Sequence, residues 1–288
     1  MTENYSDLLA KIKSSVYENA EGELLEMISF FSKRPFEELR RLRLEAKRNP
    51  NVWSSVLSAD VLKKVSNAIK LRCSGVPVQY LTRRAFFFGR EFYVDERTLI
   101  PRFDTEALVD AALPFISEKS RVLDLCCGSG CIGLTLCLEK NCYACFADVS
   151  EDALAVARKN AKILGVENAD FLRHNVFSDS LTDCFDVIVC NPPYISAQEM
   201  ENLDREVLHE PRIALEAGDG YSFYGIVPTK YSENLRNGGS LFFEVGKGQS
   251  DRVVALCESA GYDRTETFKD LNNIERVVRA RKPLETVI

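Results

Sequence analysis

The stretch RVLDLCCGSG, residues 121–130, decides the fold of this 288-residue chain. Its first half is an apolar run typical of a buried strand, and its second half is a loop of small residues that leads into a helical pattern. The same order of strand and helix follows at 143–147 and 151–164. Alternation of this kind predicts a parallel sheet with helices packed against it.

Five further runs have the composition of strands and extend the predicted sheet. They lie at 169–172, 185–190, 240–245, 262–268 and 274–280. The last two are close enough in the chain to form an antiparallel pair at one edge. The predicted fold class is therefore α/β, with a doubly wound, mainly parallel sheet of seven strands and an antiparallel edge.

The first 75 residues have a helical pattern instead. Apolar side chains recur at three- and four-residue spacing over 8–16 and 24–31, and Ser58 is placed to cap a later helix. We predict a small helical bundle over 1–75, a β-hairpin linker over 76–100 and the sheet domain over 101–288. The linker prediction depends on two aromatic runs that flank a glycine-containing turn.

The composition is that of an ordinary globular protein, with 45% hydrophobic and 28% charged residues. No apolar run is long enough to span a membrane and the N-terminus lacks a signal pattern, so we expect a cytoplasmic enzyme, most simply a monomer. Several of the ten cysteines lie in strand patterns, which favours reduced, buried thiols. Cys142 and Cys145 would point to opposite faces of a strand, so we expect no metal site.

The net charge of −6 argues against a general nucleic-acid binder. Basic residues concentrate in residues 1–102, which hold 18 Lys and Arg against 13 Asp and Glu, whereas the remainder holds 19 against 30. Solvated helix faces or a partner-binding surface would each explain the basic N-terminal third.

The loop after the strand at 122–125 has the features of a nucleotide-cofactor site. Small residues let a ligand approach the backbone N–H groups, and GSGCIG at 128–133 with an acidic residue downstream matches a dinucleotide fingerprint. This pattern does not separate NAD from S-adenosylmethionine; a plain tight turn, an N-cap role for the downstream Asp148 or a loop-ordering role for Asp124 would also explain parts of it. The residues assigned here to the cofactor are Asp124, Cys126, Cys127, Gly128, Ser129, Gly130 and Asp148.

The tetrapeptide Asn191-Pro192-Pro193-Tyr194 follows a strand pattern, at the sheet edge where open α/β folds place their sites. Two prolines fix the backbone and leave nearby carbonyls free as acceptors, while Asn191 adds an amide oxygen and Tyr194 an aromatic face. This set suits a planar group that carries NH₂, either a carboxamide or the exocyclic amine of a base. We predict these four residues as the catalytic set of an S-adenosylmethionine-dependent methyltransferase, in which in-line positioning supplies most of the catalysis.

Together these segments resemble the release factor N(5)-glutamine methyltransferases, which modify the glutamine of the Gly-Gly-Gln motif in bacterial peptide chain release factors. Besides the tetrapeptide, the resemblance rests on LIPRFDTE at 99–106, Glu210-Pro211 and Glu275-Arg276-Val277, and it spans nearly the whole chain. It implies methyl transfer from S-adenosylmethionine to the glutamine amide nitrogen. It also implies a helical N-terminal domain that helps to engage the release factor and a seven-stranded methyltransferase sheet.

The resemblance also implies roles for single residues. Asn191 and the carbonyl of Pro192 would hold the glutamine amide, Tyr194 would pack on it, and Asp148 would bind the cofactor ribose. The loop 126–130 would pass beside the methionine moiety of the cofactor.

The chain departs from the family pattern at four positions. Cys126 stands where the family usually has glycine, Asn175 where an acidic residue is common, Val176 where an aromatic is frequent, and Phe103 where proline is familiar. We still predict that Asn175 and Val176 contact the cofactor. Asn191 is predicted as a cofactor contact as well as a member of the catalytic set. We expect altered adenine packing, with apolar contact from Phe177, rather than loss of binding.

Other activities stay open at this point. The same tetrapeptide occurs in adenine methyltransferases of DNA and RNA, and a sister branch resembling the family methylates a glutamine in a ribosomal protein. An NAD-dependent oxidoreductase or a non-catalytic cofactor-binding scaffold would explain the loop but not the tetrapeptide. His174 and His209 are expected in loops without catalytic duty. The acidic sheet domain and the helical N-terminus favour a protein substrate over a nucleic acid.

Overall fold

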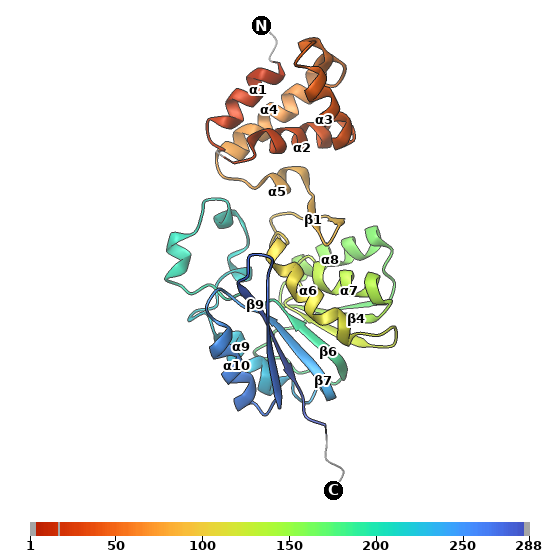
Figure 1. Cartoon of the computed structure of the whole chain (residues 1–288), viewed down its shortest axis with the longest axis vertical. Helices are drawn as coiled ribbons and strands as arrows, with labels where there is room; N and C mark the ends of the chain where they lie inside the picture. The colour runs from red at the N-terminus through yellow and green to blue at the C-terminus, as the bar shows by residue number, and fades with distance from the viewer. Residues whose placement is uncertain (1–3, 17, 285–288) are drawn as a thin grey trace. The chain divides into compact units, whose positions relative to one another are not determined.

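The computed structural model describes residues 4–16 and 18–284, which cluster into two compact units (Figure 1). One unit comprises the residues up to Arg83 together with Asp204–His209. The other comprises Arg84–Leu203 and the residues from Glu210 onward. A short piece of the chain that lies far from the N-terminus in sequence therefore belongs to the N-terminal unit.

The N-terminal unit is a bundle of helices. Its α-helices are α1 (Tyr5–Lys13), α2 (Ala20–Ser32), α3 (Phe36–Glu45), α4 (Ala59–Cys73) and α5 (Val78–Thr82). The predicted cap forms, since the Ser58 side chain accepts a hydrogen bond from the Val61 backbone N–H at 3.3 Å. Leu8, Ile12 and Leu24 are fully buried between the helices, as their spacing indicates. The predicted helical bundle is confirmed.

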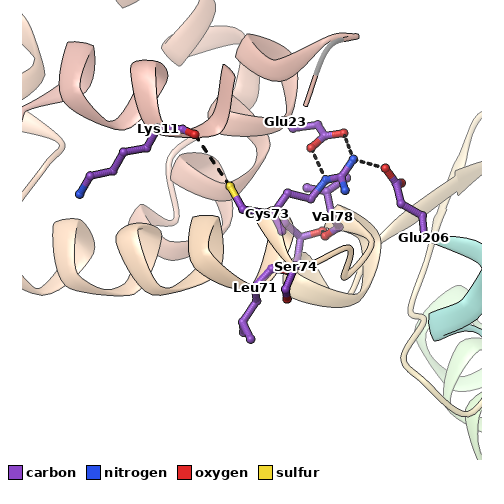
Figure 2. Close-up of polar contacts among 9 residues, drawn as sticks. Lys11, Glu23, Leu71, Cys73, Ser74, Val78 and Glu206 are labelled. Carbon is purple, nitrogen blue, oxygen red and sulfur yellow. Dashed lines mark hydrogen bonds and ion pairs between the residues drawn. The ribbon is translucent and has the colours of Figure 1, made fainter. Parts of the chain in front are cut away.

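A buried arginine fastens residues 204–209 to this bundle. Arg72, on the last turn of α4, donates from Nε to Glu23 Oε2 at 2.5 Å and from Nη2 to Glu206 Oε1 at 2.5 Å. Figure 2 shows the carboxylates of Glu23 and Glu206 turned toward this one guanidinium. The Arg72 side chain is only 6% exposed, so its charge is neutralised by pairing rather than by water.

The second unit is built on a seven-stranded sheet. Its strands are β3 (Arg121–Leu125), β4 (Tyr143–Asp148), β5 (Ala169–Arg173), β6 (Phe185–Cys190), β7 (Leu235–Glu244), β8 (Arg264–Lys269) and β9 (Glu275–Arg281). The order is β5-β4-β3-β6-β7-β9-β8, and β9 runs antiparallel to both of its neighbours, whereas the other pairs are parallel. This confirms the predicted α/β class with an antiparallel edge.

Helices cover both faces of the sheet because alternate strand residues point to opposite sides. Val122 packs in one core with α6 (Glu106–Ala112), α7 (Cys131–Lys140) and α8 (Glu151–Leu164). Leu123, the next residue, packs in the other core with α9 (Ser222–Lys230) and α10 (Ser250–Ser259). The sheet is therefore doubly wound, as predicted.

A short antiparallel hairpin precedes the sheet. It pairs β1 (Ala85–Phe87) with β2 (Arg90–Phe92) across a two-residue turn. Phe88 and Gly89 both have positive φ, at 50° and 72°, as a turn of type I′ requires. The region 76–100, predicted as a hairpin linker, thus also contains the helix α5.

The cysteines are all free thiols, and most of them are buried. Among residues 4–16 and 18–284, no group of His, Cys, Asp and Glu is arranged to hold a metal ion. Over the same residues, no helix combines the length and the apolar character that crossing a membrane requires.

Candidate active site

The strand order places two loops side by side at the centre of the sheet. The chain runs outward from β3 to β4 and β5, then returns to β6 on the other side of β3. Open α/β sheets bind ligands at such a switch point, beyond the carboxyl ends of the strands. Leu125 pairs with Cys190 in the register of β3 and β6. Cys126 and Asn191 therefore leave the sheet as neighbours.

A cavity of about 230 Å³ opens at this switch point. The residues predicted from the sequence that line it are Cys126, Cys127, Gly128, Ser129, Asp148, Asn175, Val176, Asn191 and Pro193. Four other predicted residues, Asp124, Gly130, Pro192 and Tyr194, do not line it. The two predicted loops therefore meet at the cavity, and the four other predicted residues lie outside its wall.

The loop 126–130 turns sharply to expose its backbone to the cavity. Cys126 has φ +59° and Gly128 φ +54°, a conformation that costs a non-glycine residue about 1–2 kcal/mol. A Cβ atom at Gly128 would meet no protein atom within 4 Å, so this face of the loop is open. Asn160, fully buried on α8, holds the loop from behind by donating to the Ser129 carbonyl at 2.9 Å.

Asp148 ends β4 at the wall of the cavity. Its Oδ2 accepts from the Gly128 N–H at 2.9 Å and its Oδ1 from the Ser150 N–H at 2.9 Å. Burial raises the pKa of Asp148, and these backbone donors act in the opposite direction. The cap of α8 is Ser150, which accepts from the Ala153 N–H. Asp148 is therefore not the N-cap, and its carboxyl group lies at the cavity wall with each oxygen accepting from a backbone N–H group.

Asp124 lies behind the loop instead. It is fully buried, and its Oδ2 accepts from the Gly133 N–H at 2.9 Å in the first turn of α7. Burial raises the pKa of Asp124 to about 7, partly offset by the Gly133 hydrogen bond. The residue ties the end of β3 to α7 and orders the loop from below.

The residues after β5 form another part of the wall. Asn175 Oδ1 accepts from the Phe177 N–H at 2.9 Å, and the Phe177 ring packs edge-on against Phe223 with centroids 4.8 Å apart. His174 also lines the cavity, but its Nε2 is hydrogen-bonded to the Tyr231 hydroxyl at 2.6 Å. Burial lowers the pKa of His174, so its ring has a structural contact rather than a free basic nitrogen.

The tetrapeptide after β6 is held at both ends. Asn191 Nδ2 donates to Thr105 Oγ1 at 3.5 Å, and Gln249 Nε2 donates to the Tyr194 carbonyl at 3.2 Å. In the part of the chain that the structure describes, no group donates to Asn191 Oδ1 or to the Pro192 carbonyl. Asn191 lines the cavity and Pro192 follows it in the chain, so these two oxygens are unused acceptors of the kind that an NH₂ group requires.

Several cavity residues come from segments far apart in the sequence. Arg102 forms an ion pair with the buried Glu210, whose Oε2 also accepts from the Ile100 N–H at 2.9 Å. The additional residues of the wall include Leu99, Pro101, Arg102, Thr105, Pro211, Ile213 and Phe223. Their residue types carry no local signal of a site, because the contacts span about a hundred residues; only the family resemblance had drawn attention to 99–106 and 210–211.

Known proteins resemble this chain in sequence and fold. Residues 102–224 match the family model of the methyltransferase small domain. The chain is 39% identical over 232 residues to the release factor glutamine methyltransferase of Cereibacter sphaeroides, covering 79% of this chain and 82% of the relative. It is 34% identical to that of Flavobacterium psychrophilum, covering 88% and 94%. A solved methyltransferase from Pyrococcus furiosus shares the fold, with a TM-score of 0.51 at 16% identity over 69% of this chain and 91% of that one.

Proposed function

Because the chain belongs to the release factor glutamine methyltransferase family, we propose that its cavity binds S-adenosylmethionine and that Asn191 and Pro192 hold the amide of the substrate glutamine. The enzyme transfers a methyl group to the side-chain nitrogen of a glutamine in a release factor, in the Gly-Gly-Gln motif. The observation that carries the residue assignment is the pair of unused acceptors after β6, directly beside the cofactor loop after β3.

The residues of the cavity fit an adenosyl cofactor. The Asp148 carboxyl group would accept from the ribose hydroxyls, and the open face of Gly128 leaves room for the ligand against the loop. Val176 and Phe177 supply apolar surface for the adenine, with Asn175 beside them. When bound, S-adenosylmethionine supplies a methyl group on a positively charged sulfur.

The chain's own contribution is orientation. An amide nitrogen is a poor nucleophile because its lone pair is delocalised into the carbonyl. Asn191 Oδ1 and the Pro192 carbonyl would accept both N–H bonds, which draws the nitrogen toward tetrahedral geometry and aims its lone pair. Attack neutralises the charge of the donor, and the methylated nitrogen then releases one of its two protons to water, so a strong base is not needed. Correct placement of the amide nitrogen can supply roughly 7–11 kcal/mol.

Transfer of labelled methyl groups tests this function. The protein is incubated with methyl-labelled S-adenosylmethionine and a release factor, and label should reach the Gly-Gly-Gln glutamine. A release factor with that Gln changed to Ala should stay unlabelled. Label that persists in the Ala substrate, or that reaches a ribosomal protein or an adenine instead, would contradict the substrate assignment.

The Asn191→Ala variant tests the amide contact separately. It should lose turnover while keeping its affinity for S-adenosylmethionine, because the amide oxygen is assigned to the substrate. Calorimetric titration of the cofactor, run beside the label assay, separates the two effects. A near-normal rate in this variant would refute the role of Asn191.

A further inference from the structure

A buried carboxyl group lies next to the tetrapeptide, outside the cavity. Glu244 is the last residue of β7 and is 2% exposed. Its neighbour Phe243 pairs with Cys190, the last residue of β6 before Asn191. The side chain of Glu244 has no place in the cofactor or substrate contacts assigned above.

One hydroxyl group of the tetrapeptide is hydrogen-bonded to this carboxyl group, and a second hydroxyl group lies near it. The Tyr194 hydroxyl donates to Glu244 Oε1 at 3.4 Å. The Thr105 hydroxyl, which accepts from Asn191, is near enough to the carboxyl group to lower the pKa of Glu244. Glu244 Oε2 is buried without a hydrogen-bond partner among residues 4–16 and 18–284. A buried acceptor without a donor is energetically costly, so a hydrogen bond to it is strongly favoured. Hydrogen bonds in a site without ligand are often long and tighten when substrate binds.

The directions of these hydrogen bonds follow from the chemistry of each group. An ionised carboxylate only accepts, so we expect the Thr105 hydroxyl to donate its single proton to Glu244 Oε2, which has no donor among the described residues. Thr105 Oγ1 then offers only lone pairs to Asn191, 3.5 Å away, and only the NH₂ end of the amide can face it. The oxygen end of Asn191 is left for the substrate.

We propose that Glu244 is a positioning residue for methyl transfer, which acts through Thr105 to hold the Asn191 amide with Oδ1 toward the substrate and through Tyr194 to hold the aromatic ring beside it. This proposal rests on the proposed function. An Asn191 amide turned by 180° would present NH₂ to the NH₂ of the glutamine, and a contact that should attract would become repulsive.

The surroundings of Glu244 set the pH range in which it can act. Burial raises its pKa to about 7, while Thr105, Arg276 and Tyr194 lower it and Asp104 raises it. The Arg276 guanidinium forms ion pairs with Asp104 at 2.8 Å and with Asp270 at 3.1 Å. Cys131 on α7 and Tyr224 on α9 also interact electrostatically with the Glu244 carboxyl group. The ionised, accepting form is therefore gained as pH rises through about 7, and kcat should rise with it.

Glu244→Gln and Thr105→Val test the proposal, with Thr105→Ser as the conservative rescue. At pH 8 we expect Glu244→Gln and Thr105→Val to lower kcat by about tenfold or more, the loss of one well-oriented hydrogen bond. Thr105→Ser should restore most of the rate. Cofactor affinity in Glu244→Gln should stay within about twofold of wild type because Glu244 does not line the cavity. The rise of kcat around pH 7 should disappear in Glu244→Gln. Glu233→Gln, the same substitution at an exposed glutamate, serves as the matched control and should leave kcat unchanged.

Wild-type kcat in Glu244→Gln at pH 6 and pH 8 would overturn the proposal. So would a loss of rate matched by an equal loss of cofactor affinity, which would indicate general damage. A second measurement does not depend on substrate: in protein labelled with ¹⁵N at asparagine, the Asn191 side-chain NH₂ signal should shift in Glu244→Gln and Thr105→Val. If wild-type protein binds cofactor but methylates no release factor, the proposed function fails, and this signal still decides whether Glu244 orients Asn191.

Discussion

Two glycines near the cofactor loop are required for different physical reasons. Gly128 has φ +54° and faces open space, so its role is to permit the turn and to leave room for a ligand. Gly133, in the first turn of α7, has an ordinary helical backbone. A Cβ there would lie 2.5 Å from Phe146 Cε1 and 2.8 Å from Asp124 Oδ2. Phe146 is fully buried and stacked on Phe171, so it has little freedom to move away.

Replacing each glycine by alanine should therefore produce different phenotypes. Gly133→Ala gains about 1 kcal/mol of helix propensity but forces a contact that costs roughly 1–3 kcal/mol or more, so it should lower stability. Gly128→Ala should cost about 1–2 kcal/mol of backbone strain and weaken cofactor binding about tenfold or more, because its methyl group points into open cavity. Thermal unfolding and calorimetric titration measure the two effects.

Gly165→Ala is the matched control for the backbone strain. Gly165 also has a left-handed backbone, with φ +72°, and open surroundings, but it ends α8 and is not part of the cavity wall. It should lose stability without losing cofactor affinity. Equal cofactor affinity in Gly128→Ala and Gly165→Ala would show that the ligand does not pass against Gly128.

At the residue level, the sequence predicts what lies within one loop and misses what the fold brings in from afar. The loop 126–130 and the tetrapeptide 191–194 are local patterns, and both lie at the switch point as expected. Asn160 and Glu244 are ordinary residue types outside every motif quoted above, and Thr105 belongs to the 99–106 segment only through the family resemblance. Each becomes significant only through a partner at least 31 residues away, such as Ser129 for Asn160.

At the scale of elements, boundaries were predictable where a cap chemistry marks them. The helix predicted over 151–164 agrees with α8, because Ser150 caps its start and Gly165 adopts the left-handed conformation at its end. Helix α9 was not predicted, since it contains Gly225 and Pro228 and its buried side chains give no clear amphipathic pattern. The strand predicted over 240–245 begins earlier, as β7, because residues 235–239 continue it through a glycine pair.

The inclusion of residues 204–209 in the helical unit has no sequence signal either, and it leads to a prediction. Arg72→Met should release this segment, because it removes the guanidinium that Glu206 shares with Glu23. Breaking a buried ion pair by removing one partner costs up to about 3–5 kcal/mol, and this pair is only partly buried, so the cost should be smaller. Limited trypsin digestion should then cleave faster after the exposed Arg205.

Glu38→Gln provides a comparison within the same unit. It breaks the exposed pair between Arg34 and Glu38, which are 3.0 Å apart, and such surface pairs contribute about 0–1 kcal/mol. Its cleavage rate after Arg205 should match that of the wild type. If Arg72→Met is cleaved at the wild-type rate as well, the segment is held by other contacts and the Arg72 cluster is dispensable.

For the whole molecule, stability should depend on pH through carboxyl groups whose environments act in opposite directions. Hydrogen bonds from Arg97 and Tyr93 lower the pKa of Asp95 to about 2 against the effect of burial, so this group stabilises the fold above its ordinary pKa and loses that effect in acid. Burial raises the pKa of Asp124 and of Glu244 to about 7. These two groups favour the folded state when they are protonated, so their contribution falls as pH rises.

Asp124→Asn should remove the larger part of this loss of stability with rising pH. The ordinary pKa of Asp is 3.8, so between that value and about 7 the folded chain keeps a proton that the unfolded chain releases. The resulting stability is fully present below pH of about 4 and is lost as pH rises through about 7, a change on the order of 4 kcal/mol. The Asn side chain stays uncharged and can still accept from the Gly133 N–H.

Urea unfolding at pH 5 and pH 8 measures this effect. The free energy of unfolding of Asp124→Asn should increase relative to that of the wild type at the higher pH. Asp152→Asn, at an exposed position, should show no such increase. A difference between Asp124→Asn and wild type that is the same at both pH values would mean that Asp124 is already ionised in the folded protein at pH 5.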